Sequence, residues 1–563
     1  MFNVVLEKFL ARVVAFGSAL ITIFVVSGSV TDPVNAPKLL ALGAVAGIVL
    51  GCLLSGSILK TIKRNIFLWI AMGSFITLAS SSVLASNSPL SQNLYGSYGR
   101  NNGFLTYLFL ATILLGASSL NANSSFQTIT KGLFLAGLIN VVYCAWVIAF
   151  GDFIGWENPY GNILGTLGNP NFIGAFLGIF ISAYLGYGLS ENAPRWFKFS
   201  MLLVLPVTAY EILESHAIQG RVVGLGGVAV VGFFYIRSKF KKIYLSSYGV
   251  LCALVGVLGV LGALQKGPLT SYIYKTSVSL RGQYWLAGWN TGESHPLTGV
   301  GMDAFGDWYR RSRDSHALEL PGVNTVVNAA HNVPLDMFAF GGWPLFISYL
   351  AIMGLGGWAL LKSILRTRHY DPILVVLATA WVGYQVQSII SINQIGLAVW
   401  GWVLTGTAIA YERSTKNQMP DKAIDNKLKS GSKHESQAIK GFLVSSVIGL
   451  IGLLLALPPF VADSQWRAAQ TSRTLVALED TMKPGYFNPQ NTMKYLLNIQ
   501  TLEQSNLNDL AHKYTLEAIQ WNPESFELWR VLYVIKNSTD GERADALKNM
   551  KFLDPLNSDL ATN

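Results

Sequence analysis

Hydrophobic runs separated by short polar stretches recur along most of the chain. A helix needs about 20 mostly apolar residues to cross a membrane. The pattern therefore predicts an all-α, polytopic helical membrane protein with about 12 to 13 transmembrane helices. The predicted spans cover residues 13–26, 39–59, 66–85, 104–120, 132–150, 172–187, 199–212, 222–236, 248–264, 344–361, 373–390, 397–410 and 442–458.

Basic residues set the predicted orientation of these spans. Lys and Arg gather in alternate stretches between the apolar runs, and such stretches favour the cytoplasmic side. This places the N-terminus inside and the large polar loop, residues 265–330, outside. The first apolar run follows Lys8 and Arg12 and has no small-residue cleavage site after it, so we expect a retained span and not a removed signal peptide.

The rest of the chain divides by composition. Residues 1–411 form the predicted membrane core, and residues 412–440, rich in Ser, Lys, Asn and Gly, form a basic cytoplasmic linker. Residues 441–460 form the last transmembrane helix. Residues 461–563 form an outer helical tail, and its apolar period with Asn-Pro and Asp-Pro turns resembles tetratricopeptide repeats.

The composition agrees with a membrane protein, and the charge and cysteine pattern argue against some classes of partner and site. Hydrophobic residues make up 51% of the chain and charged residues only 13%. The net charge of +10 follows the membrane orientation pattern, so it does not indicate a nucleic-acid partner. All three cysteines lie in apolar runs, which argues against a disulfide framework or a cysteine metal site.

Two arginines at the outer side are candidates for binding a phosphate group. Arg281 precedes an aromatic pair in the large loop, and Arg221 lies in the short hairpin between two spans. A guanidinium binds phosphate oxygens bidentately. The alternative for each arginine is a contact with lipid headgroups, which the spacing alone favours for Arg281 and leaves balanced for Arg221.

His331 is the candidate base, because it lies directly before an apolar run and titrates near neutral pH. The alternative is a histidine at a helix start that hydrogen-bonds to backbone. Around it we expect a substrate vestibule. Its candidates are Arg100, Arg310 and Arg311, the last two with Arg313 in an exposed basic cluster, and Asn332 beside the histidine.

The order of these motifs resembles the O-antigen ligase and O-antigen polymerase superfamily, which includes bacterial O-linked oligosaccharyltransferases. The similarity covers roughly residues 30–410 and rests on GNPN before a span, a Gln-Gly-Arg hairpin, RGQYW, HPLTGVGMDAF and AHNVPLDMFAFGG. Relatives often carry Ser-Arg-Gly in the hairpin. In GNPN, Asn169 and Pro170 suit the cap and first turn of a helix.

The resemblance implies a metal-independent glycosyltransferase without a cofactor in the bacterial inner membrane. Its donor would be a glycan on undecaprenyl diphosphate, its acceptor a lipid, a glycan or a protein, and its site and tail would lie on the periplasmic side. Arg281 and Arg221 would bind the donor diphosphate, with His331 and Arg281 as catalytic residues. The tail would be free to bind a protein partner.

Two other functions fit a polytopic chain. A transporter or flippase of a lipid-linked or anionic substrate would carry an internal repeat and polar mid-membrane groups, and the sequence shows no clear repeat. A scaffold would use the tail to recruit partners and leave the membrane core inert. The Arg and His set favours the enzyme.

Overall fold

A computed structural model describes residues 4–56, 62, 63, 65–416 and 431–560 of the chain. Helices dominate, and no β-strand forms within these ranges. The helices are α1 (Val4–Ile23), α2 (Asn35–Ser55), α4 (Ile66–Ala85), α5 (Leu90–Tyr95), α6 (Phe104–Ser118), α7 (Asn123–Phe150), α8 (Pro170–Gly188), α9 (Arg195–Glu214), α10 (Ile218–Lys239), α11 (Lys242–Ala263), α12 (Thr270–Ile273), α13 (Thr276–Ser294), α14 (Phe305–Ser312), α15 (Val333–Arg366), α16 (Pro372–Ile390), α17 (Ile395–Lys416), α18 (Gly431–Ser472), α19 (Leu475–Asp480), α20 (Thr492–Gln504), α21 (Asn508–Trp521), α22 (Phe526–Val534) and α23 (Asp540–Leu553).

Ten of the described helices are long and apolar enough to cross a membrane. They are α2, α4, α7, α8, α9, α10, α11, α15, α16 and α18. The predicted all-helical polytopic membrane protein is confirmed, although ten is fewer than the predicted number of spans. The other predicted spans correspond to α6, which has only 15 residues, and to α1 and α17, which carry charged residues.

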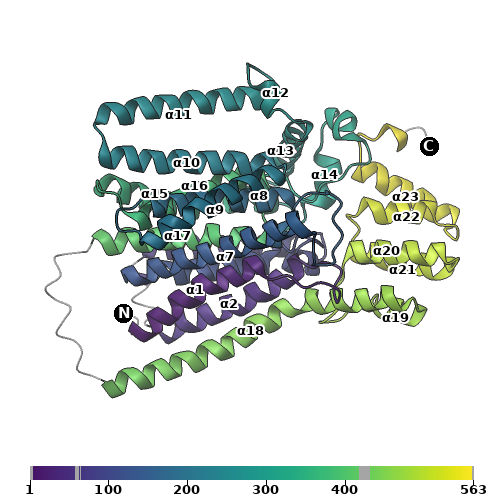
Figure 1. Cartoon of the computed structure of the whole chain (residues 1–563). Helices are drawn as coiled ribbons and strands as arrows, with labels where there is room; N and C mark the ends of the chain where they lie inside the picture. Colours follow the sequence, from purple (N-terminus) through teal and green to yellow (C-terminus); the bar gives the residue numbers. More distant parts are fainter. Residues whose placement is uncertain (1–3, 57–61, 64, 417–430, 561–563) are drawn as a thin grey trace.

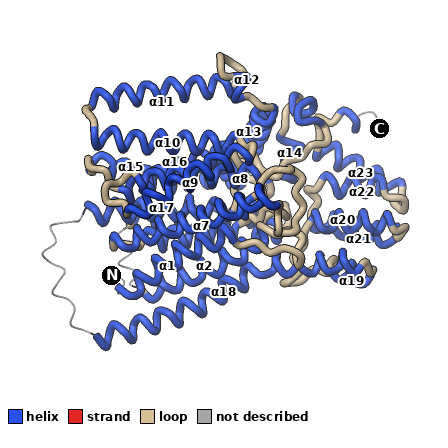
Figure 2. Tube along the Cα trace, viewed as in Figure 1, coloured by secondary structure: helices blue, strands red, loops and turns tan. Residues whose placement is uncertain are grey.

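The long helices lie side by side, and α13, α14 and most connecting segments gather at one end of them, next to the tail (Figures 1 and 2). Much of the predicted large loop is helical, because it contains α12, α13 and α14. The predicted cap of α8 is confirmed, because the Asn169 side chain accepts a hydrogen bond from Asn171 N at 2.9 Å and Pro170 occupies the first turn.

Helix α15 starts eleven residues before the predicted span, at Val333 rather than at residue 344, and is kinked at Gly341 and Gly342. The kink frees the carbonyls of Ala339 and Phe340, which accept hydrogen bonds from Val300 N at 3.0 Å and Gly301 N at 3.1 Å. Gly342 has φ +64°, and a Cβ there would lie 2.3 Å from Pro296 O. The HPLTGVG segment thus packs directly on the FGG kink.

Helix α18 runs without a break across the predicted boundary at residue 460 and joins the membrane core to the tail. The central part of the predicted linker, residues 417–430, lies outside the described residues. In the tail α20 packs on α21 and α22 on α23. The assignment of these two helix pairs to tetratricopeptide repeats stays a prediction.

Small residues bring α18 against α2. Gly43, Gly47 and Gly51 follow one face of α2, and a Cβ at Gly47 would lie 2.3 Å from Ile448 O on α18. Close backbone contact of this kind is a common way to pack helices in membranes.

Replacing Gly47 by valine should therefore destabilise the protein by about 1–3 kcal/mol, the usual effect of overpacking. Thermal unfolding in detergent measures the change. Gly73→Val is the matched control, because the space around Gly73 on α4 is empty within 4 Å. Equal unfolding temperatures for the two variants would contradict this account of the α2–α18 contact.

Candidate active site

His331 lies in the turn that leads into α15, with its backbone in the left-handed region at φ 56°. Two side chains hold this turn. Asp336 accepts a hydrogen bond from Ala330 N at 2.7 Å, and Asn332 caps α15 by accepting one from Leu335 N at 3.1 Å. Left-handed backbone at a histidine is strained and persists only where its surroundings fix it. Asn332, predicted to line the vestibule, is buried and uses its carbonyl oxygen as this cap.

The hydrogen bond of the imidazole fixes its tautomer. Nδ1 lies 3.1 Å from Ala329 O, and a carbonyl oxygen can only accept, so Nδ1 carries the hydrogen and Nε2 is free to accept a proton. Burial lowers the pKa of His331 to about 4, and the positive charges of Arg100 and Arg281 act in the same direction. His331 is therefore neutral at physiological pH.

Helix α13 brings three side chains to this histidine. Arg281, Tyr284 and Trp285 share one helical face because they are three and four residues apart. The Tyr284 ring lies 5.0 Å from the imidazole, centroid to centroid, and Trp285 Nε1 donates to His331 O at 3.3 Å. Arg281 influences His331 electrostatically. Its Nε is buried, and its guanidinium donates no hydrogen bond within the described ranges.

Arg100, in the loop between α5 and α6, also acts on this histidine electrostatically. Asp303 holds this loop in place by accepting a hydrogen bond from Ser97 N at 2.7 Å. Burial raises the pKa of Asp303 to about 7, although the Ser97 hydrogen bond and the Arg100 charge lower it. Arg100 and Arg281 thus both act electrostatically on His331, and their assignment to a substrate vestibule stays a prediction.

A polar cavity of about 580 Å³ opens beside Arg100, a size typical of ligand sites. We call it the arginine cavity. Its wall combines charged, amide and aromatic side chains, among them Arg100, Arg467, Glu157, Trp156, Tyr160 and Asn328. Asn328 lies three residues before His331 in the chain, whereas His331 itself does not line the cavity.

Arg221 lies in the first turn of α10, not in an extended hairpin. Its Nε is buried, and no described residue accepts a hydrogen bond from its side chain. The turn before α10 contacts the segment that starts α13, since Lys275 Nζ donates to His216 O at 3.1 Å. Arg221 and Arg281 are therefore on neighbouring elements at one end of the bundle.

The prediction of an exposed basic cluster is wrong. Arg310 and Arg313 are 3% exposed, and both bind Asp554 of the tail, with N–O distances of 3.0 and 2.8 Å. Arg310 also pairs with Glu527, and Arg311 with Glu524. The physical reason is that the tail folds back onto α14 and neutralises the arginines, so Arg310 and Arg311 dock the tail and do not offer free charge to a substrate.

We expect Asp554→Asn to destabilise the docked tail by about 3–5 kcal/mol, because removing one member of a buried ion pair leaves uncompensated charge. Thermal unfolding and limited proteolysis of the tail measure this change. Asp480→Asn is the control. Its pair with Lys483 is 60% and 71% exposed, so the variant should leave stability nearly unchanged. A proteolysis pattern for Asp554→Asn that matches wild type would count against the docking role.

Sequence reasoning missed Tyr284, Asp303 and Asp336. A signal existed for Asp336, since it lies four residues after the capping Asn332 in the first turn of α15. Asp303 gave none, because its partners in the Ser97–Arg100 loop are about two hundred residues away. Within the described ranges, no group of three or more His, Cys, Asp or Glu side chains gathers that could hold a metal ion.

Comparison with known families matches residues 203–350 to the O-antigen ligase family. The match includes Arg221, Arg281 and His331 and the whole of α13 and α14. No curated protein matches the chain. The family match and the membrane helices together support the resemblance to the O-antigen ligase and O-antigen polymerase superfamily.

Proposed function

We propose that the chain transfers a glycan from an undecaprenyl-diphosphate-linked donor to an acceptor hydroxyl at the outer face of the bacterial cytoplasmic membrane. One observation carries the proposal. His331, a neutral histidine with a free Nε2, lies within electrostatic range of Arg100 and Arg281, whose guanidinium groups donate no hydrogen bond to described protein atoms. A hydroxyl nucleophile needs a nearby base, and a diphosphate leaving group needs cations.

In the proposed reaction Arg281 and Arg221 bind the diphosphate, and the acceptor hydroxyl attacks the anomeric carbon. The bond from that carbon to the diphosphate oxygen breaks as the new glycosidic bond forms. The hydroxyl proton passes to Nε2 of His331, and undecaprenyl diphosphate leaves with the electron pair. No metal takes part.

Donor binding also changes the pKa of the base. The diphosphate anion offsets the positive charges of Arg100 and Arg281, which lower the pKa of His331 in the free protein. The pKa of His331 therefore rises in the complex. The base gains strength once the donor is in place.

The basic residues support the outer location. Helix α10 ends with Arg237 and Lys239, and α15 ends at Arg366. Arg221 and His331 lie at the opposite ends of these two helices. The positive-inside rule puts Arg237, Lys239 and Arg366 in the cytoplasm, and hence the site and the tail in the periplasm.

The test is transfer by the purified protein in detergent. The donor is a lipid-diphosphate-linked oligosaccharide, and the acceptors are a lipid core, a glycan and a Ser/Thr-containing protein. We expect one acceptor to gain the mass of the glycan while undecaprenyl diphosphate appears in equal amount. If no donor is consumed with any acceptor, the transferase proposal fails and a transport function takes its place.

A further inference from the structure

A second cavity, of about 310 Å³, lies between the tail and the membrane-proximal helices. We call it the junction cavity. Asp307, Arg310 and Gln92 of α5 line one side, and Gln490, Met493 and Phe526 of the tail line the other. Neither part of the chain encloses it alone.

The junction cavity continues the arginine cavity. Tyr98 and Asn328 line both, and Asn328 lies three residues before His331. The two cavities therefore adjoin, and the arginine cavity is also lined by Arg100, whose charge acts on His331. A long polar chain that enters the arginine cavity can extend from it into the junction cavity.

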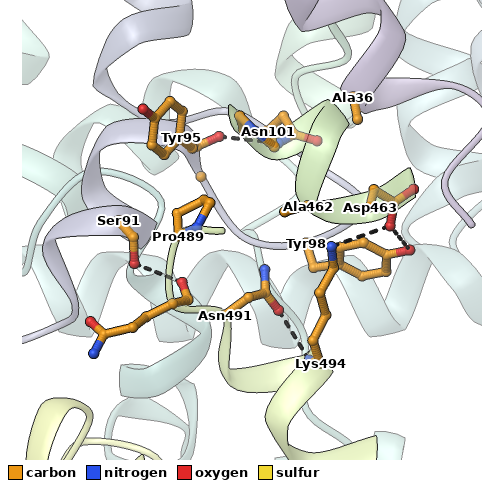
Figure 3. Close-up of a pocket in the computed structure, with 13 residues that line it drawn as sticks. Ala36, Ser91, Tyr95, Tyr98, Asn101, Ala462, Asp463, Pro489, Asn491 and Lys494 are labelled. Carbon is orange, nitrogen blue, oxygen red and sulfur yellow. Dashed lines mark hydrogen bonds and ion pairs between the residues drawn. The ribbon is translucent and has the colours of Figure 1, made fainter. Parts of the chain in front are cut away.

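Hydrogen bonds and ion pairs fix the tail against the core beside the junction cavity. Asp463 of α18 accepts hydrogen bonds from Thr31 N and Asp32 N. It also accepts one from the Tyr98 hydroxyl and pairs with Lys494 of α20 at 3.4 Å (Figure 3). The ion pairs of Arg310, Arg311 and Arg313 fix the other edge. These contacts hold the wall of the junction cavity in a fixed position.

The lining of the junction cavity suits sugar residues. The side chains of Asn328 and Gln490 form no hydrogen bond with other described residues, and an amide offers both donors and acceptors to hydroxyl groups. Tyr98 and Met493 supply apolar surface for a sugar ring, whereas the Phe526 ring is already covered by the Arg310 guanidinium, 4.1 Å from its centroid. A mixed wall of this kind and a volume of about 310 Å³ are typical of a ligand subsite.

Resting on the proposed function, we propose that the junction cavity is a saccharide subsite, shared by the tail and the core, that holds the part of an oligosaccharide distant from the reacting bond. The tail then selects for glycan length. This assigns the tail a role in substrate binding that does not require a protein partner.

The experiment uses Met493→Trp, which fills the cavity from the tail side and leaves His331, Arg281 and Arg221 unchanged. The donor and acceptor glycans carry one, two or four repeat units, varied one at a time. One of the two substrates, donor or acceptor, places its glycan in the cavity. For the four-unit form of that substrate we expect Met493→Trp to raise KM about tenfold, while kcat with one-unit glycans is unchanged. Whichever series responds, donor or acceptor, identifies the glycan in the cavity.

Val534→Trp is the matched control, because Val534 is an exposed apolar tail residue (61%, against 50% for Met493) and does not line the cavity. Gln490→Ala, which removes an amide without adding bulk, should produce a smaller change in the same direction. If Met493→Trp and Val534→Trp show the same KM for every glycan length, the subsite is wrong although transfer itself stands.

A binding measurement keeps the inference testable without turnover. The probe is the glycan pool released by mild acid from the lipid-linked fraction of producing cells, separated by size. Calorimetry with full-length protein should show about tenfold weaker binding of the long fraction to Met493→Trp than to wild type. If wild type transfers nothing but shows this difference, the proposed function fails while the subsite stands. Equal binding to both proteins overturns the subsite.

Discussion

Replacing His331 by alanine is expected to lower the rate of glycan transfer by about 100-fold or more, the usual contribution of a general base. The reason is the geometry of the imidazole. Its Nδ1 is committed to Ala329 O at 3.1 Å, so Nε2 is the only ring atom available to take the acceptor proton. The loss should appear in kcat, measured as released undecaprenyl diphosphate per protein.

His316→Ala is the control for this substitution. His316 lies in the same segment between α14 and α15, is exposed, and makes no hydrogen bond to another described residue. Its variant should transfer at the wild-type rate. Thermal unfolding must show that His331→Ala still folds, and a folded His331→Ala protein with wild-type kcat would remove His331 from the mechanism.

The pH dependence gives the same base a second signature. Because burial lowers the pKa of His331 to about 4, the imidazole stays neutral down to that pH in the free protein. On this account kcat/KM should not fall as pH drops from 8 through 6, where an ordinary histidine would already gain a proton. It should fall only as pH approaches the lowered pKa.

The parts of this site that lie close together in the chain could be predicted from the sequence alone. Arg281 and His331 each lie in a short motif, and helical spacing places Tyr284 and Trp285 on the face of Arg281. The capping of α8 by Asn169 was also local, and it was predicted correctly. Membrane spans were accessible for the same reason, since apolar length is a property of one segment.

Contacts between residues that are far apart in the chain could not be predicted from the sequence. Arg310, Arg311 and Arg313 read as an exposed cluster because their partners, Glu524 and Asp554, follow more than two hundred residues later. Arg100 was placed in the vestibule from its loop, but its approach to His331 depends on packing between distant segments. The α15 kink also escaped prediction, because it is stabilised by backbone hydrogen bonds from Val300 and Gly301.

The second large effect is expected at Arg281, where alanine should lower kcat by about 100-fold through loss of charge stabilisation on the leaving diphosphate. Arg281→Lys keeps the charge but loses the planar fork that binds two phosphate oxygens, so its loss should be smaller. Arg368→Lys is the control, since Arg368 is exposed at the opposite end of the bundle. Rates are measured with saturating donor, so that weaker binding does not mask the chemical step.

The pH profile distinguishes a direct role of Arg281 from a structural one. The positive charge of Arg281 lowers the pKa of His331, so Arg281→Gln should raise that pKa and move the acid limb of kcat/KM to higher pH. Arg281→Lys preserves the charge and should leave the limb in place. If both variants lose activity equally and neither moves the limb, Arg281 supports the fold of α13 and does not act beside His331 on the diphosphate.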